Sequence, residues 1–89
     1  MTIKYNSAFL KHYRKRILPY PELKNRFDKR IKIFAQDKNN PLLHNHQLSG
    51  DMNGFCAFSI TGDIRIIYKY ESKDTVLFYD IGTHNQVYK

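Results

Sequence analysis

The chain has 89 residues, of which 42% are hydrophobic and 15% aromatic, so a packed globule is expected and disorder is not. This length fits one core, and we take residues 1–89 as a single domain. No apolar run could cross a membrane, the N-terminus lacks the apolar region of a secretion signal, and the lone Cys56 cannot form an internal disulfide. We therefore expect a cytoplasmic protein with no membrane partner.

The net charge is +7 and unevenly distributed. Residues 1–38 contain 11 basic and 3 acidic residues, a balance of +8, whereas residues 39–89 contain 4 basic and 5 acidic residues, a balance of −1. One half of a small domain thus carries the whole excess, which suits a polyanion or an acidic protein. Basic helices without any role in nucleic-acid binding are the alternative.

The basic half has the pattern of a strand followed by a helical hairpin. Residues 3–5 alternate apolar and polar side chains, and Ser7 stands where a helix N-cap is expected. Apolar residues then recur at helical spacing up to Ile17, and the segment 19–21 with its two prolines ends this helix. Pro21 can begin a second helix over residues 21–37, with its apolar face formed by Leu23, Phe27, Ile31 and Phe34.

The second half has the pattern of an antiparallel meander. Residues 42–54 show no period and are expected to form a loop. Gly62, which tolerates positive φ, favours a tight turn at residues 61–63, and three apolar segments are predicted as strands: 55–60, 64–70 and 75–81. The order β-α-α-β-β-β predicts an α+β fold with the helical hairpin on one face of a small, twisted, mainly antiparallel sheet.

Histidines are the most versatile chemical groups in this sequence. His12 lies among cations and is expected to be solvated or to face RNA. His44 and His46 point the same way if the segment is extended. They could begin a zinc site only with a third ligand from His84, Asp51 or Asp63. Nothing else supports a metal, and we expect neither a metal nor a cofactor.

Neighbouring strands can bring the two ends of the meander together. Asp63 and Arg65 open one strand, and His84 and Tyr88 lie near the end of the chain. The alternative without catalysis has Asp63 capping a turn, Arg65 paired with Asp80 across the strands, and Tyr88 packed in the core.

Three segments resemble the RelE/YafQ branch of the RelE/ParE toxin superfamily: LSGDMNGF (48–55), GDIRIIYKY (62–70) and IGTHNQVY (81–88). The resemblance covers nearly the whole chain and implies a RelE-like fold. It also implies the toxin of a type II toxin–antitoxin system, a ribosome-dependent and metal-independent endoribonuclease that cleaves mRNA and blocks translation. The implied partners are a cognate antitoxin, also in a higher-order toxin–antitoxin complex, and the ribosome with its mRNA.

The resemblance also implies the site residues. His46, Asp63 and His84 match residues of YafQ-like members, Tyr88 matches their terminal aromatic residue, and Arg65 matches the arginine that RelE-like members use at the scissile phosphate. On this basis His46 and His84 transfer protons, Arg65 binds the phosphate, Asp63 orients a histidine, and Tyr88 stacks on a base or orients the 2′-OH.

This sequence departs from the family pattern in three ways. Ser59 stands where YafQ-like members have a second histidine, and Ile64 replaces their tryptophan. RelE-like members place an arginine near the position of His84. The site thus combines two chemistries, which leaves open which histidine is the acid and which is the base.

The basic hairpin gains a role from the same resemblance, as the surface that meets rRNA phosphates or an acidic antitoxin segment. The residues expected there are Lys11, Arg14, Lys15, Lys29 and Arg30. Two alternatives remain: a ParE-like toxin that inhibits DNA gyrase without nuclease activity, and a degenerate toxin that retains only antitoxin binding.

Overall fold

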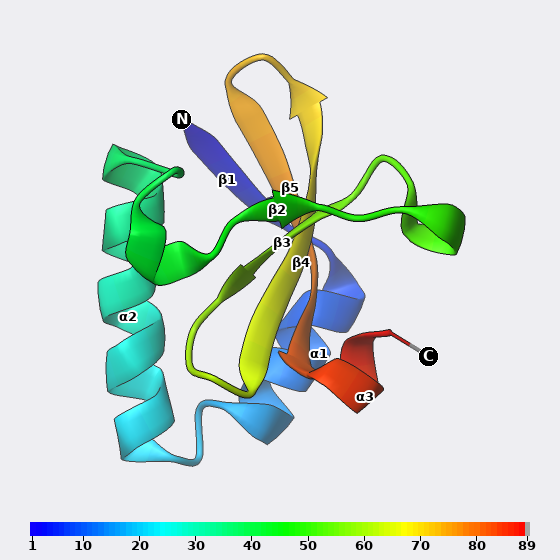
Figure 1. Cartoon of the computed structure of the whole chain (residues 1–89). Coiled ribbons are helices and arrows are strands. Elements are labelled where there is room, and N and C mark those ends of the chain that lie inside the picture. The colour runs from blue at the N-terminus through cyan, green and yellow to red at the C-terminus, as the bar shows by residue number, and fades with distance from the viewer. Residues whose placement is uncertain (89) are drawn as a thin grey trace.

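In the computed structural model, which describes residues 1–88, a five-stranded sheet carries two long helices on one face and a short helix on the other (Figure 1). The strand order is β1-β5-β4-β3-β2; β1 runs parallel to β5 and the other neighbours are antiparallel. The strands are β1 (Thr2–Tyr5), β2 (His46–Gln47), β3 (Cys56–Ser59), β4 (Ile64–Ser72) and β5 (Thr75–Thr83). The predicted α+β architecture is confirmed.

The helical hairpin consists of α1 (Ser7–Arg16) and α2 (Pro21–Gln36). α1 begins at Ser7 itself, because the preceding residue is the cap: the side chain of Asn6 accepts the hydrogen bond from the backbone N–H of Phe9 at 2.7 Å. The predicted Ser7 cap is therefore wrong by one position. Pro21 begins α2 as predicted, where its missing N–H costs no helical hydrogen bond.

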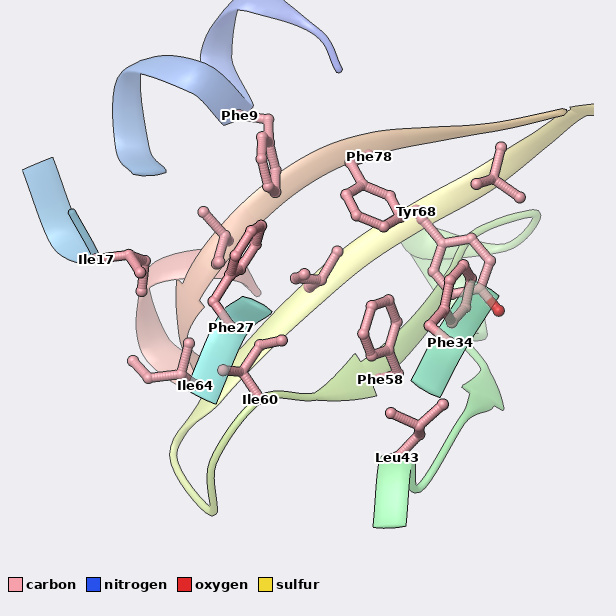
Figure 2. Packing of buried hydrophobic residues seen from close by; sticks show 13 residues of the cluster. Phe9, Ile17, Phe27, Phe34, Leu43, Phe58, Ile60, Ile64, Tyr68 and Phe78 are labelled. Carbon is pink, nitrogen blue, oxygen red and sulfur yellow. The ribbon is translucent and has the colours of Figure 1, made fainter. Parts of the chain in front are cut away.

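The core between the helices and the sheet is mainly aromatic (Figure 2). Phe34 of α2 stacks on Phe58 of β3 with ring centroids 4.4 Å apart, and Tyr68 and Phe78 contact both rings. Each such side chain, fully buried, stabilises the fold by about 1.5–3 kcal/mol relative to exposure. Phe9 extends this cluster to α1. The apolar stripes read from the sequence thus face the sheet.

The segment 42–54 is more regular than the predicted loop, and the C-terminal segment forms a helix that was not predicted. The expected loop 42–54 contains two short 3-10 helices, η1 (Pro41–Leu43) and η2 (Gly50–Met52), with β2 between them. The C-terminal segment forms α3 (His84–Val87), which packs Val87 against Ala57 and Ile67 on the second face of the sheet. The turn at 61–63 exists, but Gly62 does not adopt positive φ.

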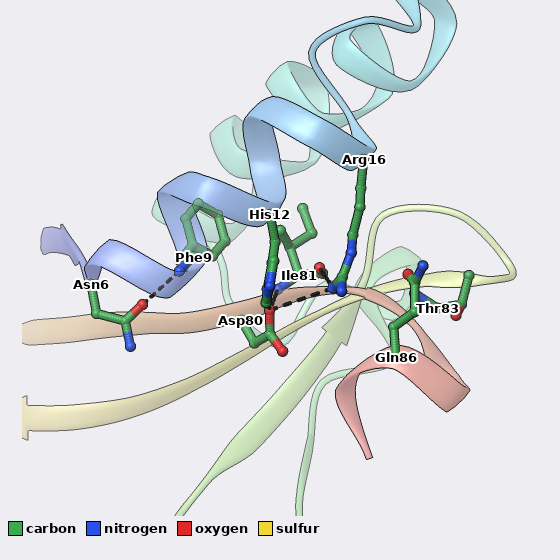
Figure 3. A network of polar contacts seen from close by, with 8 residues as sticks. All are labelled: Asn6, Phe9, His12, Arg16, Asp80, Ile81, Thr83 and Gln86. Carbon is green, nitrogen blue, oxygen red and sulfur yellow. Dashed lines mark hydrogen bonds and ion pairs between the residues drawn. The ribbon is translucent and has the colours of Figure 1, made fainter. Parts of the chain in front are cut away.

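A polar network joins α1 to the end of β5 (Figure 3). Asp80 lies 2.6 Å from His12 Nδ1 and 3.7 Å from Arg16, and Arg16 also donates to the carbonyl of Ile81 at 2.8 Å. The prediction that His12 is solvated or faces RNA is therefore wrong, because Asp80 binds its ring. This network fixes the backbone just before α3.

Within residues 1–88, no helix is both long and apolar enough to cross a membrane.

Candidate functional site

Four of the five predicted catalytic residues line one surface hollow of about 270 Å³. His46 begins β2, Arg65 lies on β4, His84 begins α3 and Tyr88 caps its C-terminal end. The polar groups are accessible, because both histidines are exposed and Arg65 is half-buried. The rest of the lining comes from the segment between β2 and β3: Leu48, Ser49 and Met52.

The ring of His46 is oriented by its own loop. Its Nδ1 lies 2.8 Å from the carbonyl oxygen of His44. A carbonyl can only accept a hydrogen bond, so Nδ1 carries the proton of the neutral ring. Nε2 of His46 therefore presents a lone pair, which is the form a general base requires.

His84 has the opposite tautomer. Its Nδ1 lies 3.2 Å from Nη1 of Arg65, and a guanidinium can only donate. Nδ1 of the neutral ring is thus the acceptor, and the proton is on Nε2. The ring of Tyr88 contacts His84 edge-on, with centroids 4.5 Å apart. Two histidines with complementary proton positions therefore line the same hollow.

The backbone that carries His84 is held by a capping box. The side chain of Thr83 accepts from the backbone N–H of Gln86, and the side chain of Gln86 accepts from the backbone N–H of Thr83 at 2.8 Å. Gly82 lies where a Cβ atom would come within 2.6 Å of Gln86 Oε1 and 2.7 Å of Arg16 Nη1. Only glycine leaves room for both contacts, so Gly82 and Arg16 help to position His84.

Asp63, the fifth predicted residue, lines a neighbouring hollow of about 460 Å³ with Arg65 and His84. In the described part of the chain, no hydrogen bond or ion pair joins its carboxylate to a histidine; Arg65 is the partner of His84. Of the alternative roles without catalysis, those of Asp63 and Asp80 are not observed, whereas Tyr88 does pack against the small cluster of Ala57, Ile67 and Val87. Thr61 caps the turn, accepting from the backbone N–H of Asp63, and Asp80 binds α1 rather than Arg65.

Two of the residues that differ from the family pattern, Ser59 and Ile64, can be located in the structure. Ser59 pairs in register with Arg65, and the other neighbour of Arg65 is Gly82 on β5. Ser59 therefore lies beside the site, one strand away from Arg65. Ile64, in place of tryptophan, is buried in the aromatic core and does not line the hollow.

The predicted basic surface divides into two parts. Lys11, Arg14, Lys15 and Lys29 are exposed, and none forms an ion pair within residues 1–88. Arg30 is half-buried and donates from Nη1 to the carbonyls of two other segments, so it is partly structural.

Sequence reasoning missed a second, larger hollow of about 470 Å³, which shares His46 and Arg65 with the first. Arg26 and His44 also line it. The spacing of Arg26 and Arg30 was a usable signal, because residues four apart share one face of a helix. Similarly, the pattern Thr83-x-x-Gln86 is the signature of a capping box and could have predicted α3.

Among residues 1–88, side chains of His, Cys, Asp and Glu do not form a group of three that could hold a metal ion. His44 and His46 were considered as the start of a zinc site. In the structure the carbonyl of His44 instead accepts a hydrogen bond from the ring of His46 and orients it.

Comparisons with known proteins identify the family and the fold of this chain. The family model for YafQ, a bacterial toxin of a type II toxin–antitoxin system, matches residues 1–89, whereas no curated protein matches significantly.

Solved structures share the fold at low sequence identity. YafQ from E. coli strain BL21(DE3) is 18% identical over 98% of this chain and 97% of that chain, with a TM-score of 0.76. The E. coli DinJ–YafQ complex gives 20% identity over 98% and 97%, with a TM-score of 0.72. A YoeB/ParE toxin from Agrobacterium tumefaciens gives 16% over 94% and 99%, with a TM-score of 0.73. The chain belongs to the YafQ family of type II toxins.

Proposed function

We propose that this toxin is a ribosome-dependent, metal-independent endoribonuclease that cleaves mRNA and so blocks translation. The observation that carries the proposal is the pair of histidines, His46 and His84, with complementary tautomers at one hollow that also contains Arg65. In this set neutral His46 is the base, Arg65 is the fixed cation, and His84 becomes the acid once Nδ1 takes a second proton and no longer accepts from Arg65. These are the three requirements of RNA cleavage without a metal.

The proposed step is attack by the neighbouring ribose. Nε2 of His46 takes the proton of the 2′-OH, and the 2′-oxygen bonds to phosphorus. The bond from phosphorus to the 5′-oxygen breaks, and the leaving oxygen takes the Nε2 proton of His84. His84 acts here as the imidazolium, with a proton on both ring nitrogens, and ends the step as a neutral ring. Arg65 meets the negative charge that grows on the phosphate. The products are a 2′,3′-cyclic phosphate and a 5′-hydroxyl end.

Two further side chains complete the proposed site. Tyr88 holds the imidazole of His84 by ring contact and offers an aromatic face for a base. Asp63 lines the adjoining hollow with His84 and Arg65, and its proposed role is to orient the histidine.

The exposed cations of the hairpin support a ribosomal partner. Lys11, Arg14 and Lys15 are all on α1 and lack ion-pair partners within residues 1–88. Such side chains would bind rRNA phosphates with strong salt dependence.

The same charge suits an acidic antitoxin segment, and a solved structure with this fold is the E. coli complex of DinJ with YafQ. We propose a cognate antitoxin as the second partner, which competes with the ribosome for the basic surface and can form part of a higher-order toxin–antitoxin complex. We propose that this activity takes place in the cytoplasm, where the proposed ribosomal target is found.

The test is primer extension on a translated reporter mRNA after induction of the toxin, beside a reporter whose start codon is removed. The proposal predicts new 5′ ends inside the coding region of the translated message only. If replication stops first and both messages stay intact, the toxin acts on a target such as DNA gyrase. If neither translation nor replication stops, the chain retains only antitoxin binding.

A further inference from the structure

The hollow of about 470 Å³ beside the proposed catalytic site is strongly basic. The described residues that line it come from α2, the segment around η1 and β2, and the adjacent ends of β3 and β4 with the turn between them (Figure 1). None of these residues is acidic. Arg26, Arg30 and Arg65 contribute three permanent positive charges, and His44 and His46 add two imidazoles. A hollow with these donors and no carboxylate favours an anion with several oxygen atoms.

One wall of this hollow is preorganised. Nη1 of Arg30 donates to the carbonyls of Leu42 and Ser59, which ties α2 to the η1 segment and to the end of β3. A guanidinium has five N–H donors, so fixing Nη1 leaves others for a ligand. Arg26 lies one helical turn before Arg30, is exposed, and forms no hydrogen bond or ion pair within residues 1–88. The pair thus offers one anchored and one free guanidinium.

His44 has an unusual backbone on the other side of the hollow. Its φ is 49°, and it is the only residue other than glycine with positive φ among residues 1–88. Its carbonyl accepts the hydrogen bond from His46, while its own exposed ring lines the hollow. A left-handed backbone in a non-glycine residue is uncommon, and such strain concentrates at functional sites.

We infer that Arg26, Arg30 and His44 form a subsite for the RNA phosphate next to the scissile one. This inference rests on the proposed function and deepens it. Arg65 and His46 line both hollows, so an RNA strand that places its scissile phosphate at Arg65 enters the second hollow with an adjacent nucleotide. The subsite holds the strand in register with His46 and His84.

Two substitutions isolate the subsite. Arg26→Gln removes the free guanidinium, which has no ion-pair partner in the described chain. His44→Gly removes the imidazole but keeps the carbonyl that orients His46, and glycine readily adopts the positive φ of this position. Lys32→Gln is the matched control, because Lys32 is an exposed cation of α2 that lines neither hollow. We expect all three variants to keep the melting temperature of the wild type.

The assay is single-turnover cleavage of a short synthetic mRNA on purified programmed ribosomes, after the scissile position has been mapped with the wild type. We expect the single-turnover rate constant, measured below saturation of the ribosome, to fall about tenfold in Arg26→Gln and in His44→Gly and to stay unchanged in Lys32→Gln. In a second mRNA, a methylphosphonate removes the charge of one phosphate beside the scissile one, on either side in turn. At one of these positions the methylphosphonate should lower the cleavage rate of the wild type about tenfold. At the same position it should not lower the cleavage rate of the Arg26→Gln variant any further.

The outcomes separate the two proposals. Wild-type cleavage with unaffected Arg26→Gln and His44→Gly variants would overturn the subsite and leave the nuclease in place. The subsite is also overturned if the effects of methylphosphonate and substitution multiply, because the two would then act on different contacts. A wild type that leaves the message intact overturns the nuclease, and the subsite with it.

Discussion

Replacing Gly82 with alanine tests how the end of β5 positions His84. A Cβ atom at this position would lie 2.6 Å from Gln86 Oε1, 2.7 Å from Arg16 Nη1 and 3.1 Å from Gln86 Cβ. Both polar atoms end flexible side chains, but each is engaged: Gln86 caps α3 through Thr83, and Arg16 donates to the carbonyl of Ile81. Gly82→Ala must therefore displace both contacts.

The cost follows from the bonds that are lost. Losing a helix cap costs about 1 kcal/mol, and losing a hydrogen bond from a charged group costs about 1.5–3 kcal/mol. Together we expect a loss of about 2–4 kcal/mol in the free energy of unfolding. For a domain of this size, that lowers the melting temperature by at least about 8 °C.

The assay is thermal unfolding followed by circular dichroism, with Gly62→Ala as the control. Nothing lies within 4 Å of a Cβ atom at Gly62, and its φ is not positive, so this variant should stay within about 0.5 kcal/mol of the wild type. Equal melting temperatures for Gly82→Ala and Gly62→Ala would refute the reasoning. The clash would then be relieved without loss of the cap or of the Arg16 contact.

Three other predictions follow from the described contacts. Tyr88→Phe should raise the free energy of unfolding, measured by chemical denaturation, by about 1–3 kcal/mol. The hydroxyl of Tyr88 is buried with no hydrogen-bond partner among residues 1–88, and the substitution removes it. A loss of stability would mean that this hydroxyl does form a hydrogen bond. Burial raises the pKa of Tyr68 above its ordinary value of 10.0. The stability that this shift contributes is present below pH 10 and is lost as the pH rises toward the folded-state pKa. Urea titrations above pH 10 should therefore show a shallower loss of stability in Tyr68→Phe than in the wild type, and identical slopes would contradict the shift. Lys15→Gln should weaken ribosome binding, measured by co-sedimentation at several salt concentrations. The slope of log binding constant against log salt concentration should fall by about one. An unchanged slope would show that Lys15 does not contact the ribosome.

Helical periodicity predicted α1 and α2 because each turns one apolar face to the sheet, whereas β3, β4 and β5 were predicted from their apolar, β-branched and aromatic content. Phe27 and Phe34 face the sheet as their spacing requires, and Pro21 begins α2 at the predicted residue. The errors occur where short polar contacts decide the structure. Asn6 rather than Ser7 caps α1, and the two-residue strand β2 is too short to show alternation.

Most residues of the candidate site were predicted, but the contacts that orient their side chains were not. The resemblance named His46, Arg65, His84 and Tyr88, and these four line one hollow. The tautomers depend on a carbonyl and a guanidinium that only the fold brings near, so the sequence left acid and base unassigned. Asp80 shows the same limit, because its partners on α1 lie more than 60 positions away in the chain.

The +7 charge can now be placed. Part of the basic excess is structural, since Arg16 and Arg30 bind backbone carbonyls of other segments. The free cations proposed to meet a ribosome or an acidic antitoxin are the exposed side chains of Lys11, Arg14, Lys15 and Lys29, and Arg26 extends the positive surface to the edge of the site.

The most direct test of the central claim is the single-turnover rate of mRNA cleavage on purified ribosomes for His46→Ala and His84→Ala beside the wild type. We predict that the wild type leaves a 2′,3′-cyclic phosphate at the cut. Each substitution should lower the rate by about 10²–10⁴ while ribosome binding, followed by co-sedimentation, is retained. Cleavage at the wild-type rate by both variants would contradict the assignment of His46 and His84 as base and acid.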